Sequence, residues 1–375
     1  MNKKKHILVL PVNYPNPANT MAGTFFRSQV NALRESGHTV GVISFCLLRI
    51  SELKHISYID QLETNNEIQL CFPAVPKLQP LNHKIRTLLT TRLIKQYIKA
   101  CGKPDVIHVH VYSAAGAAIW AKEKYGIPYI ITEHYSHFAN NQITPYFHQV
   151  ALRAFKNAST CLAVSRSLGN TLEHLFDIKF TCVPNIVDKE FTYQPCVSSQ
   201  YGKFILNVAS LTKIKNHKRL INAFEQVTRQ NDSVNLVIVG DGPLKNELQC
   251  LAKKLTLENR IFFLGKKDKT EIAKLMNQAQ LFCLSSDYET FGVVLIEALS
   301  CGLPVVAPNV GGIPEIINSD ELGILCNLSE SSMAESIKIC LKRSINKKNL
   351  MLLASSKYSH STISKALTET YSNIE

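Results

Sequence analysis

The sequence contains no apolar run that approaches the roughly 18–20 residues of a membrane-spanning helix. Its first apolar stretch, Ile7–Val12, follows three lysines and could be mistaken for a signal peptide. The stretch is too short for that role and has no small-residue cleavage site behind it. A continuous apolar run of this length is typical of a buried parallel strand. We therefore expect a cytoplasmic protein whose first strand lies here.

Metal-ligand spacing is also missing. The 11 cysteines include no C-x-x-C pair, which is typical of reduced core thiols in a cytosolic protein. His108 and His110 are two apart on a predicted strand and therefore point to one face of it, where they could bind a metal. No third ligand accompanies them at a suitable spacing. We expect no metal site and no bound cofactor.

The glycine fingerprint of nicotinamide-binding proteins is absent. Residues 7–45 are typical of a strand, a glycine-containing loop, a helix and a second strand, but their glycines do not fit G-x-G-x-x-G. This disfavours a dinucleotide-dependent oxidoreductase.

Acidic residues are missing from residues 69–104, which contain seven basic residues. The whole chain carries a net charge of +13, and residues 1–190 hold 21 Lys and Arg against 12 Asp and Glu. Such a basic half suits nucleic acid, anionic lipid or a phosphorylated substrate, or is simply a solvated basic face. Because aromatic residues do not interleave with the basic ones and no recognised motif is present, we expect no nucleic-acid binding.

Residues 83–99 have the pattern of an amphipathic helix. One side collects apolar residues and the other carries basic ones. This pattern fits either a helix lying on an anionic membrane or a helix packed on the core with a solvated basic face. The apolar residues are Ile85, Leu88, Leu89, Leu93, Tyr97 and Ile98, and the basic ones are Lys84, Arg92, Lys95 and Lys99.

The length of 375 residues favours two domains. Apolar runs of strand length alternate with helical patterns throughout, which predicts an α/β fold with two doubly wound, Rossmann-like domains facing each other across a cleft. A stretch rich in turn formers, residues 188–202, predicts the linker between them.

Two glutamates, Glu289 and Glu297, lie eight positions apart in residues 285–315. Glu289 lies in a polar, loop-like run, whereas Glu297 lies in the apolar run VVLIEAL, which predicts a buried helix. Thr290 is a candidate N-cap of this helix, and the pair at 301–302 (Cys-Gly) can end it. Taken as spacing alone, the pair could equally be one exposed glutamate and one that pairs with a basic residue.

The start of that helix is a candidate anion site. The backbone N–H groups of Phe291, Gly292 and Val293 would have no partner within the helix, and they lie at the positive end of its dipole. Gly292 lets a ligand approach the backbone closely. One elongated anionic ligand, such as a diphosphate, could therefore touch these amides and both glutamates.

The segment from Glu289 to residue 317, ETFGVVLIEALSCGLPVVAPNVGGIPEII, resembles the E-x7-E signature of the retaining glycosyltransferases of family 4. The resemblance implies the GT-B architecture. It places the first domain at residues 1–190 plus a returning C-terminal helix at about 358–375, and the nucleotide-sugar domain at residues 203–357.

The resemblance also implies roles for single residues. Glu289 would contact the donor sugar, and Glu297 the ribose. Lys215 would grip the diphosphate, helped by Lys213, and His134, at the end of a predicted strand, would contact the donor sugar near the scissile bond. His134 could instead be a packing or helix-capping histidine.

Other positions match the family less fully. The loop at residues 21–24, with Gly23, resembles the glycine loop beside the donor phosphates. Gly265 ends a predicted strand at the place of the base pocket. The family arginine is replaced by Ser210, and the glycine after Lys215 by Asn216.

The function implied is a retaining, metal-independent hexosyltransferase, because D-x-D is absent. It would use a nucleoside diphosphate sugar and a glycan or lipid-linked glycan acceptor in cell-surface polysaccharide or lipopolysaccharide assembly, at the inner face of the cytoplasmic membrane. Alternatives that keep the fold are a nucleotide-sugar epimerase, a phosphorylase and a non-catalytic partner subunit.

Overall fold

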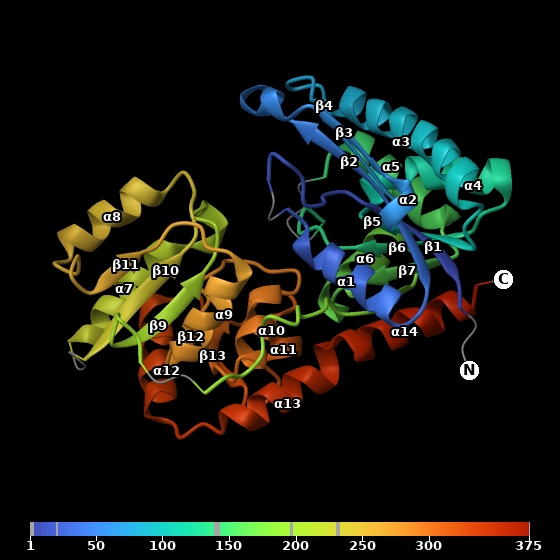
Figure 1. Ribbon diagram of the computed structural model, residues 1–375. Helices are drawn as coiled ribbons and strands as arrows, with labels where there is room; N and C mark the ends of the chain where they lie inside the picture. The colour runs from blue at the N-terminus through green and yellow to red at the C-terminus, as the bar shows by residue number, and fades with distance from the viewer. Residues whose placement is uncertain (1–3, 20–21, 139–142, 196–197, 230–232, 375) are drawn as a thin grey trace. The chain divides into compact units, whose positions relative to one another are not determined.

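The computed structural model describes residues 4–19, 22–138, 143–195, 198–229 and 233–374. Met21, in the expected glycine loop, and residues 196–197, in the expected linker, lie outside these ranges. The chain divides into two compact units. Unit 1 comprises Met1–Ile186 with His360–Glu375, and unit 2 comprises Val187–Ser359. Each unit is a sheet with helices packed on it (Figure 1).

The sheet of unit 1 has the strand order β3-β4-β2-β1-β5-β6-β7-β8. All neighbouring pairs are parallel except β3 and β4. The strand order reverses direction between β1 and β5, and in such sheets ligands bind at the carboxyl ends of the strands beside that point. The strands are β1 (His6–Pro11), β2 (Thr39–Leu48), β3 (Ser57–Gln61), β4 (Glu67–Pro73), β5 (Val106–His110), β6 (Tyr129–Glu133), β7 (Thr160–Ala163) and β8 (Phe180–Cys182).

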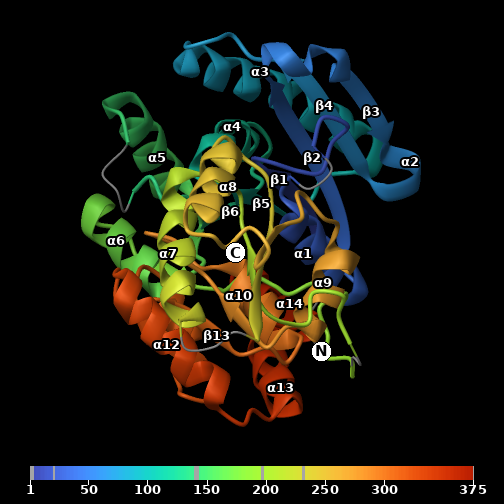
Figure 2. The ribbon, with the colours of Figure 1, turned by 90° about the vertical axis from the view of Figure 1, so that its left-hand side faces the viewer.

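The helices of unit 1 include the last one of the chain. α14 packs against α1, and its Tyr371 hydroxyl lies 2.7 Å from Nδ1 of His108 on β5. α3 packs on β2 (Figure 2). The helices are α1 (Thr24–Glu35), η1 (Ile50–His55), α2 (Leu62–Asn65), α3 (Gln79–Cys101), η2 (Tyr112–Ala114), α4 (Gly116–Tyr125), α5 (Pro145–Asn157), α6 (Arg166–Phe176) and α14 (His360–Ser372).

The sheet of unit 2 is parallel throughout, in the order β11-β10-β9-β12-β13-β14. Its order reverses between β9 and β12. The strands are β9 (Lys203–Val208), β10 (Val234–Val239), β11 (Ile261–Phe263), β12 (Leu281–Cys283), β13 (Val305–Pro308) and β14 (Gly323–Cys326). The helices are η3 (Lys213–Lys215), α7 (His217–Thr228), α8 (Lys245–Lys254), α9 (Lys269–Gln278), α10 (Val293–Ser300), α11 (Ile313–Ile316), α12 (Glu330–Lys342) and α13 (Lys347–Tyr358).

Burial explains why the apolar runs form strands. Ile7, Leu8, Val9 and Leu10 of β1 are each at most 1% exposed, because helices cover both faces of a parallel sheet. The expected α/β class with two Rossmann-like sheets is confirmed.

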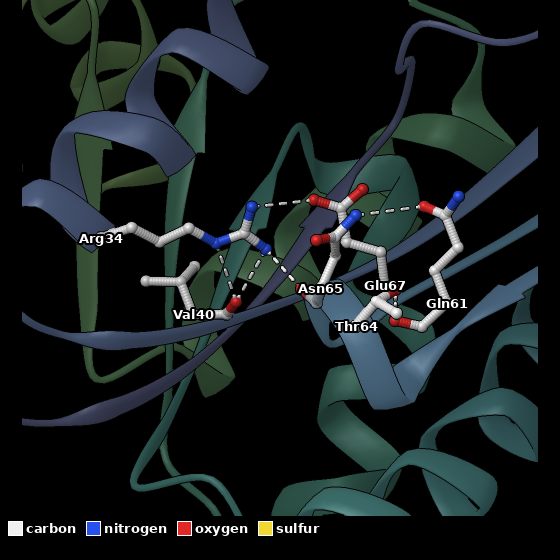
Figure 3. A network of polar contacts seen from close by, with 6 residues as sticks. All are labelled: Arg34, Val40, Gln61, Thr64, Asn65 and Glu67. Atoms are coloured by element: carbon white, nitrogen blue, oxygen red, sulfur yellow. Dashed lines mark hydrogen bonds and ion pairs between the residues drawn. The ribbon is translucent and has the colours of Figure 1, made fainter.

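An arginine links α1 to two inner strands of the sheet of unit 1 (Figure 3). Arg34, in the last turn of α1, donates hydrogen bonds to the carbonyl oxygens of Val40 and Asn65 and forms an ion pair with Glu67 at 3.0 Å. A rigid guanidinium can reach several acceptors at once. Arg34 therefore ties α1 to the start of β2 and to β4.

Two local predictions are wrong. Thr290 is not the N-cap of α10, because the helix begins at Val293 and Gly292 takes the cap position. The apolar side predicted for α3 is also wrong in part. Leu88, which was placed on that side, is 55% exposed, whereas Ile94, which was not, is buried against the sheet.

Candidate functional site

An ion pair lies at the point where the strand order of unit 2 reverses. Lys215 follows β9 and Glu289 follows β12, and Lys215 Nζ lies 2.5 Å from Glu289 Oε1. The two side chains are 25% and 14% exposed. Ser286 Oγ donates a hydrogen bond of 2.7 Å to the same carboxylate oxygen. The structure thus brings together the two residues that the sequence assigned to a donor's diphosphate and sugar.

The loop that carries Glu289 is held by a residue that the sequence analysis missed. Arg219, on α7, donates to the carbonyl oxygen of Ser285 at 3.0 Å and pairs with Asp287 at 2.5 Å. Arg219 is buried, and an arginine fork can bind a carboxylate and a carbonyl together. Its position three residues after Asn216, in the same segment as Lys215, was the only available signal.

Asn216 stands where the family 4 pattern has a glycine, and its conformation explains why the replacement is tolerated. Its φ is 43°, in the left-handed region, which asparagine adopts more readily than most residues. Its side chain accepts a hydrogen bond from Arg219 N at 3.2 Å and so caps α7. The turn that presents Lys215 is therefore kept.

The loop that contains Gly311 and Gly312 supports Glu289, the acidic member of the ion pair. Gly311 has a φ of 53°, and a Cβ built on it would lie 1.9 Å from the carbonyl oxygen of Glu289. Gly312 N donates to that oxygen at 3.0 Å. A side chain at position 311 would collide with this carbonyl oxygen, and the Gly312 N–H binds it. Residues 311–312 therefore fix the backbone of Glu289.

The N-terminus of α10 lies next in the chain. Gly292 has a φ of 98° and Phe291 is buried. Among the described residues, we find no acceptor for the N–H groups of Phe291, Gly292 and Val293. The first turn of a helix offers such donors to an anion.

Glu297 is on α10, one helical turn after Val293, and is half-buried. Burial raises the pKa of its carboxyl to about 7, and the nearby Lys269 ammonium opposes part of that rise. Lys269 itself pairs with Asp188. Within the described ranges the Glu297 carboxyl forms no ion pair or hydrogen bond with another side chain, so it is available to another partner.

The remaining unit 2 candidates lie on loops after β9 and β11. Ser210 and Lys213 are exposed. Gly265 accepts a hydrogen bond from Gly240 N at 2.8 Å and has a φ of 67°.

His134 lies in unit 1, directly after β6. Its Nε2 is 3.1 Å from His110 Nδ1, and its ring meets that of Phe26 edge to face with centroids 5.1 Å apart. Burial lowers the pKa of His134 to about 3, so the imidazole is neutral at physiological pH. Gly23, the N-cap of α1, has a φ of 58°, and a Cβ there would lie 2.8 Å from Phe26.

The residue before His134 was also missed. The buried Glu133 carboxylate accepts hydrogen bonds from the backbone N–H groups of Tyr112, His134 and Tyr135 at 2.9–3.0 Å. It therefore fixes the segments that follow β5 and β6, and with them His134. Burial raises the pKa of Glu133 to about 7, although these three donors oppose the rise.

The chain matches two models of glycosyltransferase families. Residues 22–191 match the model described as Glycosyltransferase Family 4, and residues 190–352 match Glycosyl transferases group 1. The chain is 30% identical over 243 residues to N-acetyl-alpha-D-glucosaminyl L-malate synthase from Bacillus anthracis, covering 61% of this chain and 62% of that protein.

Two further matches extend the comparison. The chain is 39% identical over 142 residues to N-acetylgalactosamine-N,N'-diacetylbacillosaminyl-diphospho-undecaprenol 4-alpha-N-acetylgalactosaminyltransferase from Campylobacter jejuni, covering 37% of this chain and 38% of that one. The structure of sucrose-phosphate synthase from Thermosynechococcus elongatus superposes with a TM-score of 0.80 and 18% identity, over 98% of both chains.

The fold and the two family matches define a glycosyltransferase of the GT-B class. The chain belongs to glycosyltransferase family 4.

Glu297 should make stability depend on pH. Its pKa of about 7 in the folded protein lies above the ordinary 4.5, so folding favours the protonated carboxyl. Its contribution is therefore fully present below about pH 4.5 and is lost as the pH rises through 7. We expect the melting temperature of the wild type to fall relative to Glu297→Gln between these pH values. Glu335→Gln, at an exposed position, is the control, and an equal pH trend for both variants would contradict the assignment.

Proposed function

We propose that the chain is a retaining glycosyltransferase that moves a sugar from a nucleoside diphosphate sugar to a glycan or lipid-linked glycan acceptor. The observation that carries the proposal is the Lys215–Glu289 pair at the switch point of the sheet of unit 2, beside the free amides of α10. Both groups are held in place before any ligand arrives, by Arg219, Asn216 and residues 311–312.

The donor diphosphate would occupy the space at Lys215 and the amides of Phe291–Val293. As the glycosidic bond breaks, negative charge grows on the leaving diphosphate. A fixed ammonium and oriented N–H groups stabilise this charge without having to reorganise. Lys213 and the Ser210 loop would border the same phosphates, and Ser210 cannot supply the charge of an arginine.

Glu289 would accept hydrogen bonds from hydroxyls of the donor sugar, and Glu297 from the ribose. Glu289 shares its carboxylate with Lys215, so one pair would contact the sugar and its leaving group together. Gly265 would border the base. In unit 1, a neutral His134 would offer a ligand a hydrogen bond rather than a charge.

Glu289→Gln and Lys215→Gln should each lower kcat by roughly 10²–10³-fold, the usual effect of removing one preorganised electrostatic group. The donor is first identified by thermal shift with a panel of nucleoside diphosphate sugars, because a bound ligand raises the melting temperature. Turnover is then measured as released nucleoside diphosphate in the presence of membrane extract.

The matched control is Glu271→Gln, because Glu271 forms an exposed ion pair with Lys267 at 2.8 Å in the same unit. Full turnover in folded Glu289→Gln would contradict the proposal. Donor binding without any turnover in the wild type would instead favour a non-catalytic partner subunit, to which the exposed Ser210 lends support. An epimer formed without acceptor would identify an epimerase.

We also propose that transfer needs no metal, because Lys215 and the α10 amides already supply positive charge to the diphosphate. Excess EDTA should leave turnover unchanged. Activity that EDTA abolishes and Mg²⁺ or Mn²⁺ restores would contradict this prediction.

We propose that unit 1 binds the acceptor at the inner, anionic face of the cytoplasmic membrane, and that the transfer belongs to cell-surface polysaccharide assembly. Within the described ranges, no helix has both the length and the apolarity to cross a bilayer. Five large apolar side chains are nevertheless 39–69% exposed on two segments that leave the carboxyl ends of β2 and β4. We call them the apolar rim: Ile50, Leu53, Ile56, Leu78 and Leu81.

Exposed basic residues accompany the apolar rim, namely Arg49, Lys54, Lys77 and Lys84. Apolar side chains beside basic ones suit the interface of an anionic membrane, where each charge near the surface contributes about 1 kcal/mol. The Campylobacter relative is named for an acceptor linked to diphospho-undecaprenol, which agrees with a membrane acceptor. The surface differs from the one expected from sequence, because the middle of α3 packs on the sheet.

The protein should sediment with vesicles that contain anionic lipid and not with neutral vesicles. Replacing Ile50 and Leu78 by serine should weaken this binding, since it removes exposed apolar surface from the rim. Leu352→Ser, at a leucine of similar exposure on α13, is the control. Equal indifference to both kinds of vesicle would count against the membrane proposal.

A further inference from the structure

A cavity of about 510 Å³ lies wholly within unit 1. Its walls come from the segments that follow β1, β5 and β6, from β2 and from the first turns of α3 and α5. This is the carboxyl end of the sheet beside its switch point, where α/β sheets bind ligands. The lining residues are Val12, Leu47, Gln79, Asn82, His83, Arg86, Tyr112, Ser113, Tyr135, His137, Ile143, Thr144 and Phe147.

One face of α3 supplies the polar wall. Gln79, Asn82, His83 and Arg86 are spaced by three, one and three residues, so they lie on the same side of the helix. The Asn82 side chain already bonds the backbone N–H and carbonyl of Val75 at 2.8 and 2.9 Å. It therefore shapes the loop before α3 and is not available to a ligand.

Arg86 differs from most arginines of the chain. It is half-buried, and within the described ranges it has no carboxylate partner and no hydrogen bond. Its guanidinium carbon lies 5.9 Å from the centroid of the Phe45 ring. No aspartate or glutamate lines the cavity, and residues 139–142, outside the described ranges, contain none in the sequence.

A partly desolvated cation without a counter-ion is unfavourable. Burial lowers the pKa of Arg86, and neighbouring Tyr135 and Cys46 oppose the shift. A guanidinium nevertheless keeps its proton in proteins. The charge therefore persists in the cavity, and an anion would remove the cost by pairing with it.

A second unsatisfied group lies one helical turn away. His83 Nε2 is buried and has no hydrogen-bond partner among the described residues, while Nδ1 lies 3.2 Å from the Tyr146 hydroxyl. Burial and the charge of Arg86 lower the pKa of His83 to about 4, so its imidazole is neutral. Rings of Tyr112, Tyr135 and Phe147 provide flat apolar walls beside these polar groups.

We infer that this cavity binds the acceptor and that Arg86 pairs there with an anionic group of it, a phosphate or a carboxylate. His83 contributes a hydrogen bond to the same ligand. The inference rests on the proposed glycosyltransferase function and deepens it, because it states the charge of the acceptor. It does not depend on the donor residues of unit 2.

The first experiment is chemical protection of single arginines in the wild-type protein. Phenylglyoxal modification is followed by mass spectrometry of the peptides, with inorganic pyrophosphate or succinate as the probe anion. Modification of Arg86 should slow roughly tenfold or more when the cavity is occupied, as charge-assisted hydrogen bonds of this kind allow. Arg229, exposed and paired with Glu225, is the internal control and should be unaffected.

The two probes distinguish the sources of the anion. Protection by pyrophosphate alone supports a phosphate-bearing acceptor, and protection by succinate alone supports a carboxylate. Protection by both supports an anionic acceptor of either class. An Arg86 modification rate that neither anion changes overturns the inference.

The second experiment separates this cavity from the donor site. Binding of a probe anion that protects Arg86 is measured by calorimetry in Lys215→Gln, which lacks the proposed diphosphate lysine. Adding Arg86→Gln should weaken the remaining binding roughly tenfold or more, whereas adding Arg229→Gln should not. Equal binding in both double variants overturns the inference. Unchanged turnover in Glu289→Gln would instead overturn only the donor assignment.

Discussion

The interaction on which the candidate site depends is the 2.5 Å contact between the Lys215 ammonium and the Glu289 carboxylate. Glu289 comes from a loop and Lys215 from the last residue of the short helix η3, and such segments hold a side chain in place only when other contacts restrain their backbone. Here Arg219 restrains the loop after β12, and residues 311–312 restrain Glu289 itself. The positions of both charges are thus set before a ligand binds, which is the condition for electrostatic stabilisation of a developing charge.

The charged side chains of the two units differ in the partners that the fold gives them. In unit 2, Lys215 has a carboxylate partner, so the free protein avoids an uncompensated cation. In unit 1, Glu133 is satisfied by three backbone donors, whereas Arg86 lines a cavity whose described residues include no carboxylate. A charge left unpaired in a polar cavity costs stability, and this cost is what makes the cavity of unit 1 selective for a ligand of opposite charge.

Local pattern predicted the fold well where burial alone decides. The continuous apolar run of β1 became a buried parallel strand, because apolar side chains are favoured between two layers of helices. Pattern failed where a tertiary contact decides. The short strand β8 and the antiparallel pair of β3 and β4 were not expected, and α10 begins three residues after Thr290 because Gly292 can adopt the left-handed conformation that the turn requires.

The sequence by itself determined the alternation of strands and helices, the two glutamates eight positions apart and the lysine at 215, because each is a matter of residue type and spacing. Tertiary structure alone decided which charges meet. Lys215 and Glu289 are 74 residues apart in sequence, and Arg219 reaches Asp287 from another helix. The unpaired state of Arg86 likewise depends on which side chains the fold places around it, since pairing is a property of distance in space and not of distance along the chain.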